Sequence, residues 1–303
     1  MIRIVFLGTS ASIPTKNRAL PSIMIIREGE QLLFDCGEGT QRQMIKAGIG
    51  LRKKLKIFIT HMHADHVLGL AGILMTLSLT GRQDPLEIYG PSELEFFIEC
   101  LKRLFNFNPT FNLIIHKVSN GTIYHGRGFR IDAFEVKHTT ESYGYALIED
   151  PRPGKFNPKK AEELGVPRGP LWKALQEGKS VTINGRVVKP EDVMGPPRKG
   201  LKVVYTGDTA PTKTIVRISR DADLLIHEAT FDDSLEELAN EELHSTASQA
   251  AKTALEAGVK KLVLTHISPR YEDPSVLLVQ AKRIFENTLI AEDLMDMTLT
   301  WSD

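Results

Sequence analysis

Short runs rich in apolar and β-branched residues recur along this chain, separated by stretches that contain glycine, proline or charged residues. Runs of this kind are typical of buried or half-buried β-strands. The sequence therefore predicts strands at Ile2–Leu7, Ser22–Ile26, Gln31–Asp35, Lys56–Thr60, Leu86–Tyr89, Leu113–Lys117, Phe129–Val136, Tyr143–Ile148, Lys202–Tyr205, Leu224–Ile226 and Leu262–Leu264.

Segments with helical character lie between these strands. One begins at Ser92, an N-cap residue type, and has acidic residues in its first turn, while another ends before Gly258, a common stop signal. The predicted helices are Thr40–Ala47, Val67–Leu79, Ser92–Leu104, Ser245–Glu256 and Pro274–Phe285. Two groups of strands with helices outside them indicate an α/β fold in which two sheets face each other under helical layers.

A dense group of metal-binding residue types follows one of the predicted strands. The segment His61-Met62-His63-Ala64-Asp65-His66 places three imidazoles and one carboxylate in six residues. Neutral imidazole suits zinc, and a carboxylate can complete or bridge the coordination shell. The alternative is a cluster of surface histidines, but nine histidines in 303 residues would rarely gather in this way by chance. We therefore predict a metal site at this turn.

One turn approaches an ion from one side only, so further ligands must come from other strand ends. His138, Asp208 and His266 each follow a run of apolar and β-branched residues. Taken alone, each of them is more often an ordinary hydrogen-bonded turn residue. Because four segments share the same pattern of a strand followed by a ligand type, together they favour one common site.

The order of these residues resembles the dinuclear site of the metallo-β-lactamase superfamily, from Met1 to His266. Three segments resemble, more specifically, the tRNase Z (ribonuclease Z) family in its short form: Leu33–Gln41, His227-Glu228-Ala229-Thr230 and His244-Ser245-Thr246. Pro14–Arg18 resembles the family's PxKxRN loop, but Asn17 and Arg18 stand in the reverse order. That departure leaves the roles of Lys16 and Arg18 open.

The resemblance implies an αββα metallo-β-lactamase sandwich and two zinc ions per chain. It assigns one ion to His61, His63 and His138, the other to Asp65, His66 and His266, and a bridging role to Asp208. It also implies catalytic roles for Asp65, which would hold or deprotonate the attacking water, and for His244, a proton donor oriented by Glu228. From the residues alone, the sequence favours His244 as a neighbour of a helix N-cap at Ser245 or Thr246, and Glu228 fits an ordinary salt bridge.

The activity implied by the resemblance is zinc-dependent endoribonuclease cleavage that removes the 3′ trailer from precursor tRNA. The products would be a tRNA with a 3′-hydroxyl and a trailer with a 5′-phosphate. The resemblance further implies a homodimer and a cytoplasmic location.

The charge of the chain is unevenly distributed. The whole chain is neutral, yet residues 151–200 carry eleven Lys and Arg against five Asp and Glu, a net charge of +6 against −6 elsewhere. The same segment holds eight of the sixteen prolines and seven of the 23 glycines, which oppose regular structure except for a short amphipathic helix around Leu171–Leu175. It falls between His138 and Asp208, so we interpret it as a basic arm inserted into a single domain, 1–303. In the resembling family such an arm binds RNA; the alternative is a solvated loop.

Composition excludes other classes. No stretch of eighteen apolar residues predicts a membrane span, and the first apolar run is too short for a signal peptide. Two cysteines, Cys36 and Cys100, give no disulfide framework, and no CxxC spacing exists. Two rival functions stay open. One is a hydrolase of a small phosphodiester, sulfate ester or thioester, and the other is a non-catalytic RNA-binding module.

Overall fold

The computed structural model describes residues 1–51 and 54–301. The chain divides into two compact units, which are treated separately below. The first comprises Met1–Ile148 and Leu201–Asp303, and the second comprises Glu149–Gly200. The boundaries of the second unit lie within two residues of the basic segment 151–200.

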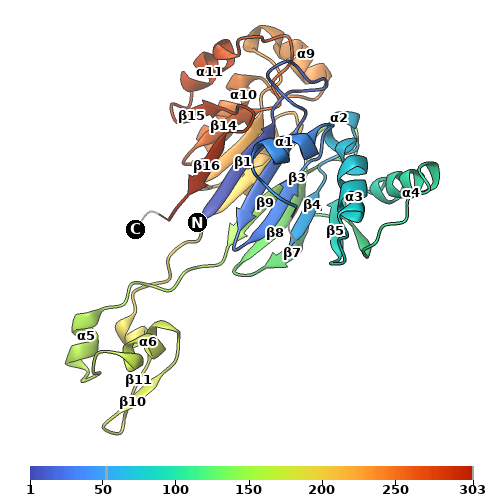
Figure 1. Ribbon diagram of the computed structural model, residues 1–303. Helices are drawn as coiled ribbons and strands as arrows, with labels where there is room; N and C mark the ends of the chain where they lie inside the picture. Colours follow the sequence, from blue (N-terminus) through green and yellow to red (C-terminus); the bar gives the residue numbers. More distant parts are fainter. Residues whose placement is uncertain (52–53, 302–303) are drawn as a thin grey trace. The chain divides into compact units, whose positions relative to one another are not determined.

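Two seven-stranded sheets form the centre of the first unit (Figure 1). The first sheet has the order β16 (Asp296–Leu299), β1 (Ile2–Gly8), β2 (Ser22–Arg27), β3 (Glu30–Phe34), β4 (Leu55–Phe58), β5 (Leu86–Gly90) and β6 (Leu113–Lys117). The second has the order β15 (Thr288–Ile290), β14 (Leu262–Thr265), β13 (Leu224–Glu228), β12 (Lys202–Tyr205), β9 (Tyr143–Glu149), β8 (Phe129–Glu135) and β7 (Gly121–Gly126).

Helices cover both outer faces of this pair of sheets. Those packed on the first sheet are α1 (Thr40–Lys46), α2 (Ala64–Val67), α3 (Gly69–Leu79) and α4 (Leu94–Leu104). Those associated with the second sheet are α8 (Lys213–Ser219), α9 (Glu236–Glu241), α10 (Ala247–Ala257) and α11 (Ser275–Lys282), with a short 3₁₀ turn at Asp233–Leu235. The predicted αββα sandwich is therefore confirmed.

Successive side chains of each strand point to opposite faces of its sheet, and together they form three apolar layers in this unit. In β1, Ile4 and Phe6 point into the cluster between the sheets, whereas Val5 and Leu7 point into the cluster under α1 and α3. Successive side chains of a strand point to opposite faces, so one strand can serve both layers. A third cluster lies between the second sheet and its helices, and it includes Ala250, Ala251 and Ala254 of α10.

All eleven predicted strands and five predicted helices of the sequence analysis are present, with ends shifted by a few residues. The predicted helix Val67–Leu79 differs most, because the chain breaks at Leu68 into α2 and α3. The strands β7, β15 and β16 and the helices α8 and α9 were not predicted. They are short or lie at sheet edges, where apolar periodicity is weak.

The second unit is more regular than its composition suggested. It contains α5 (Pro158–Glu163), α6 (Pro170–Gln176), a hairpin of β10 (Val181–Ile183) and β11 (Arg186–Val188), and α7 (Pro190–Val193). The helix expected around Leu171–Leu175 is confirmed as α6, but the expectation of an otherwise irregular arm is wrong. Proline stands at the first turn of all three helices, where it is tolerated. An apolar cluster of its own holds the unit together: Ala161, Val166, Leu175, Val181, Val188 and Val193.

Two glycines bring the turn after β4 against the end of β3. The Cys36 amide donates to the carbonyl of His66 (2.8 Å), and the Gly69 amide donates to the carbonyl of Cys36 (2.8 Å). A Cβ atom on Gly69 would lie 2.1 Å from the carbonyl oxygen of Gly37, and one on Gly37 would lie 2.4 Å from the carbonyl oxygen of Asp65. Only glycine permits this approach.

Gly69→Ala is expected to lower the free energy of unfolding by roughly 1–3 kcal/mol, because overpacking forces the backbone apart. Gly72→Ala in the same helix is the matched control, since its Cβ would meet only the flexible end of Gln41 at 3.0 Å. Urea denaturation should show Gly72→Ala to be neutral or stabilising. Equal stability of both variants would mean that the close approach at Gly69 is not a constraint.

Candidate metal centre

The predicted metal-binding residues lie where strands of both sheets end. The turn of His61 to His66 follows β4, and His138 follows β8. In the second sheet β12, β13 and β14 are parallel, so Asp208 and His266 leave the same edge. The structure brings together all seven predicted side chains in overlapping groups of ligand atoms: His61, His63, Asp65, His66, His138, Asp208 and His266.

The first group contains three imidazoles with converging nitrogens. His61 Nε2 lies 3.0 Å from His63 Nδ1, which lies 3.2 Å from His138 Nε2. Ligands at the usual Zn–N length in a tetrahedron would be about 3.3 Å apart, so the spacing fits one ion. Asp208 belongs to this group as well, because its Oδ2 lies 3.7 Å from His61 Nε2 and 4.0 Å from His138 Nε2.

The second group consists of Asp65, His66 and His266, and Asp208 contacts two of its members. Asp208 Oδ2 lies 3.3 Å from His66 Nε2 and 3.2 Å from His266 Nε2. Asp65 Oδ2 lies 3.6 Å and 3.5 Å from the same two nitrogens. The arrangement can therefore hold two cations, with Asp208 between them.

Buried polar atoms without partners support this interpretation. Among the described residues, His66 Nε2, His266 Nε2 and Asp208 Oδ1 are buried and form no hydrogen bond. Leaving such atoms unsatisfied is costly. Imidazole nitrogens and carboxylate oxygens are ligands that zinc accepts, so the donor set fits a pair of zinc ions.

Asp35 holds His66 from behind. Its Oδ2 accepts a hydrogen bond from His66 Nδ1 (2.9 Å) and another from the hydroxyl of Tyr205 (2.7 Å). Its Oδ1 accepts from the amide (2.8 Å) and the hydroxyl (2.9 Å) of Thr60. A carboxylate behind an imidazole fixes the tautomer and leaves Nε2 free for a metal. Burial, together with the Asp35 charge, raises the pKa of Tyr205, so its hydroxyl stays a donor.

The other buried imidazoles are held in the same manner. Thr60 Oγ1 lies 2.9 Å from His61 Nδ1, and His138 Nδ1 donates to the carbonyl of Leu243 (3.2 Å). His266 Nδ1 lies 2.9 Å from Thr230 Oγ1. Each contact engages Nδ1 and turns Nε2 toward the centre.

Glu228 and His244 form a second polar pair beside the metal centre. His244 Nδ1 donates to Glu228 Oε1 (2.7 Å), and that carboxylate also accepts from the Thr209 and Ser245 amides (2.8 and 3.1 Å) and from the Thr230 hydroxyl (2.7 Å). Burial alone would lower the pKa of His244, but Glu228 raises it to about 9. The Glu228 carboxylate therefore favours the protonated form of His244. One nitrogen of His244 also lies within 4.8 Å of ligand atoms of Asp208 and His266.

The two interpretations left open for this pair can now be compared with the structure. Thr246 caps α10, in a capping box with Gln249, so His244 does lie beside a helix N-cap and also contacts Glu228. Glu228 forms its ion pair with His244 itself. The salt-bridge interpretation of Glu228 and its pairing with His244 are thus one and the same contact.

The loop from Ser12 to Arg18 contacts the centre through its backbone. The Ser12 amide donates to Asp65 Oδ2 (2.9 Å). Arg18 points into the protein, where Nη1 donates to Thr9 Oγ1 and to the Ala291 carbonyl (both 2.7 Å). Lys16 is exposed. Counted from Pro14, Arg18 occupies the arginine position of the PxKxRN pattern and Ala19 stands in place of its asparagine, so the expected reversal of Asn17 and Arg18 is wrong. Arg18 anchors this loop.

Sequence analysis did not identify the residues that hold the imidazoles from behind. Asp35 follows β3 in the same way that the ligands follow their strands, which was a usable signal. Thr60 and Thr230 adjoin assigned residues but have no distinctive pattern. Tyr205 is the last residue of β12, and nothing in the sequence distinguishes it from a core residue.

Thr230→Val is expected to weaken metal binding about 10–100-fold, the usual cost of losing a group that orients a ligand, because His266 Nδ1 loses its partner. Zinc affinity can be measured by competition with a chromogenic chelator. Thr230→Ser keeps the hydroxyl and should retain nearly the original affinity. An unchanged zinc affinity in Thr230→Val, with the fold intact by circular dichroism, would contradict this role.

Comparison with known proteins shows which families this chain resembles. A family model described as "Anti-Pycsar protein Apyc1" matches residues 2–152, and one described as "Beta-lactamase superfamily domain" matches residues 189–267. Ribonuclease Z of Methanosarcina acetivorans is 51% identical over 302 residues, which cover 99% of each chain. Ribonuclease Z of Archaeoglobus fulgidus is 47% identical, covering all of this chain and 99% of the relative.

The solved structure of the short form of human tRNase Z is 28% identical. It aligns with a TM-score of 0.72 and covers 99% of this chain and all of the human chain. The fold, the order of the converging side chains and the identity over the full length lead to one conclusion. This chain belongs to the ribonuclease Z family, within the metallo-β-lactamase superfamily.

Proposed function

We propose that this protein is a zinc-dependent endoribonuclease that removes the 3′ trailer from precursor tRNA. The tRNA would keep a 3′-hydroxyl and the trailer a 5′-phosphate. The observation that carries the proposal is the buried Glu228–His244 pair beside two overlapping groups of metal ligands. Full-length relatives named ribonuclease Z support the substrate class.

We assign two zinc ions to the centre. His61, His63 and His138 would hold one, and Asp65, His66 and His266 the other, with Asp208 between them. When bound, such a pair supplies Lewis-acid polarisation of a phosphoryl oxygen and a nucleophile at neutral pH. Support comes from the seven convergent donors, which exceed what one tetrahedral ion can use.

His244 is assigned as the general acid. Its Nδ1 proton is engaged by Glu228 Oε1, so the proton on Nε2 is the one it can give to the leaving 3′-oxygen of the ribose. A ribose alkoxide is a poor leaving group and needs this proton. The Glu228 carboxylate, which several hydrogen bonds fix in place, holds the His244 ring in position and favours its protonated form.

Asp65 is assigned as ligand and base. The Ser12 amide holds its Oδ2 close to His266 Nε2, which fixes the carboxylate at the centre. From that position Asp65 can orient the attacking water and accept its proton.

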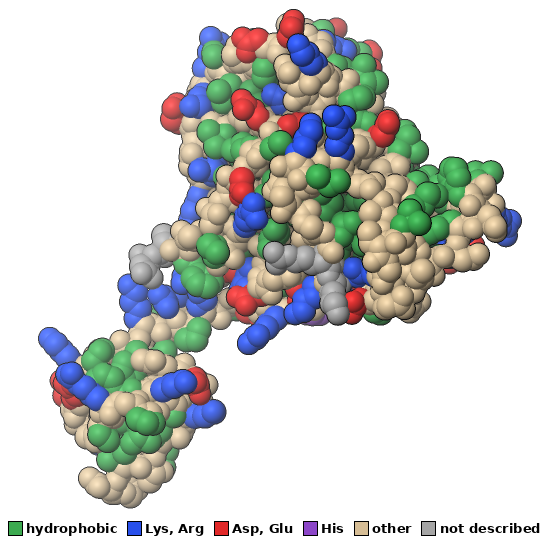
Figure 2. Space-filling model, viewed as in Figure 1, with side chains coloured by type: hydrophobic (Ala, Val, Ile, Leu, Met, Phe, Trp, Pro, Cys, Tyr) green, Lys and Arg blue, Asp and Glu red, His purple; other side chains and the backbone are tan. Residues whose placement is uncertain are grey.

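The second unit is assigned to binding of the tRNA body. Figure 2 shows Lys and Arg side chains on its surface. Several of these cations are already paired, as Arg168 is with Glu162 (2.6 Å) and Lys173 and Lys179 are with Glu177. In contrast, Lys155, Lys159 and Lys160 line a 570 Å³ hollow and form no ion pair within the described residues. They are the groups of this unit best suited to phosphates.

Two rival functions are weaker. A hydrolase of a small phosphodiester, sulfate ester or thioester would share the metal ligands but would need neither the basic second unit nor His244 as a general acid. A non-catalytic RNA-binding module would not need seven convergent ligands.

Among the described residues no helix has the length and apolar character to cross a membrane. The homodimer and the cytoplasmic location stay predictions.

His244→Ala is expected to slow cleavage of precursor tRNA by on the order of 10²–10⁴, the usual contribution of a general acid. Hydrolysis of a nitrophenyl phosphodiester should suffer far less, since nitrophenolate leaves without a proton. Elemental analysis should still find two equivalents of zinc in the variant. Equal losses on both substrates would exclude the role of proton donor.

The triple variant Lys155→Gln, Lys159→Gln and Lys160→Gln is expected to raise KM for precursor tRNA while kcat stays within about twofold. Each lost phosphate contact should also reduce the slope of log K against log salt by about one unit. The matched control is Arg168→Gln with Lys173→Gln and Lys179→Gln, which removes the same number of cations, each of which Glu162 or Glu177 already partners. If both variants raise KM equally, the effect is one of net charge and the hollow is not the binding surface.

A further inference from the structure

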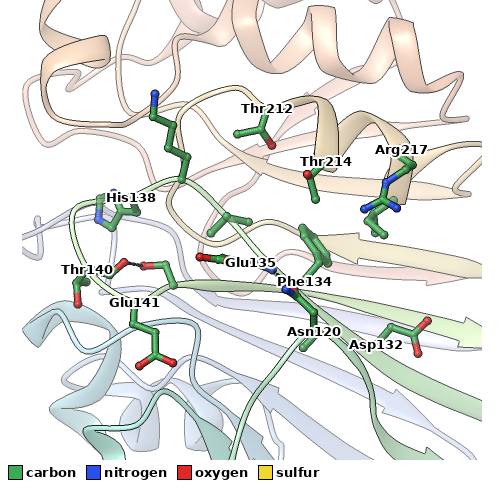
Figure 3. A pocket seen from close by; sticks show the side chains of 16 residues that line it. Asn120, Asp132, Phe134, Glu135, His138, Thr140, Glu141, Thr212, Thr214 and Arg217 are labelled. Atoms are coloured by element: carbon green, nitrogen blue, oxygen red, sulfur yellow. Dashed lines mark hydrogen bonds between the residues drawn. The ribbon is translucent and has the colours of Figure 1, made fainter.

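A large groove opens beside the metal centre within the first unit. It has a volume of about 820 Å³ and is lined by β8, the turns around it and α8. In Figure 3 its labelled side chains extend from His138 and Thr140 on one side to Asp132 and Arg217 on the other. His138 both lines the groove and belongs to the metal centre, so the groove adjoins that centre.

The cations of this groove are available to an anionic ligand. Lys137 on one wall and Arg217 on the α8 wall form no ion pair within the described residues. Arg217 is exposed, and Thr212 and Thr214 lie on the same helical wall (Figure 3). A row of hydroxyls and a guanidinium offers donors to phosphate oxygens.

Two of the three carboxylates that line the groove are already occupied. Asp132 accepts from the Thr122 hydroxyl (2.7 Å) and pairs with Arg130 (3.1 Å). Glu141 accepts from the hydroxyls of Tyr143 (2.9 Å) and Ser92.

The third carboxylate, Glu135, has no side-chain partner within the described residues, and its amide donates to Asn120 Oδ1 (2.6 Å). A free carboxylate repels phosphate but accepts a hydrogen bond from a ribose 2′-hydroxyl. The lining therefore suits a ribonucleotide chain better than a simple anion or a deoxyribonucleotide chain.

We propose that this groove binds the single-stranded RNA trailer on the 3′ side of the cut. This inference rests on the proposed function. The volume of the groove is that of a small-ligand pocket, which is the scale of a few unpaired nucleotides. On the tRNA side of the cut the RNA soon becomes a double-stranded stem, whereas the trailer is free to enter as a single strand.

The test compares trailer lengths in two variants of α8. Arg217→Glu reverses a charge that lines the groove, and Lys213→Glu reverses an exposed charge one turn earlier that does not line it. Each variant is assayed on precursor tRNAs with trailers of one and of ten nucleotides. Arg217→Glu should raise KM about tenfold for the long trailer and leave the short one within twofold. Lys213→Glu should change neither.

A cross-link gives an independent readout. In His244→Ala, 4-thiouridine in the third to fifth trailer nucleotides should cross-link to the peptide that contains residues 212–217. The groove assignment alone would be overturned if Arg217→Glu changed KM for neither trailer or equally for both. Cross-links that formed only outside residues 212–217 would overturn it as well. Failure of the unaltered protein to cleave either precursor would instead overturn the proposed function, and the groove assignment with it.

Discussion

The metal centre depends on hydrogen bonds behind its imidazoles. Four buried histidines present Nε2 to the centre because Asp35, Thr60, Thr230 and the Leu243 carbonyl engage Nδ1. Without those partners the rings could adopt the other tautomer or rotate, and the convergence of donors from both sheets would be lost. Asp35 is the most connected of these groups, because it joins His66, Thr60 and Tyr205 in one buried network.

The two-sheet core gives that network its rigidity, and the same contacts extend to the proton donor. Thr230 links His266 to Glu228, and Glu228 in turn holds His244. A single hydroxyl thus connects a proposed metal ligand to the proposed general acid. Removing the Thr230 hydroxyl should disturb both residues. The metal affinity then reports on His266, and the rate of cleavage of a substrate with a poor leaving group reports on His244.

The sequence predicted the sandwich and the convergence of the seven candidate ligand side chains because both depend on local patterns. The ends of β6 and β12 match the predicted runs, since charged or polar residues bound compact apolar stretches there. Edge strand β16 has only alternate partly buried positions, so its pattern was too weak. The second unit was expected to be irregular because the residues of its small core, alanine, valine and one leucine, are scattered along the sequence. The backbone conformation around the site could not be predicted from the sequence either. Four residues there, Ser12, Asp35, Leu243 and His266, have φ between 56° and 58°. Non-glycine residues adopt this conformation only when their surroundings impose it.

The most direct test of the account is to identify the ends produced from a precursor tRNA. A transcript labelled at both termini, incubated with the zinc-loaded protein, should be cut at the end of the tRNA body. The account predicts a tRNA with a 3′-hydroxyl and a trailer with a 5′-phosphate, both abolished by a chelator and restored by zinc. A 2′,3′-cyclic phosphate on the tRNA would contradict attack by water. An intact precursor in a preparation that hydrolyses a small phosphodiester would contradict the assignment of tRNA as substrate.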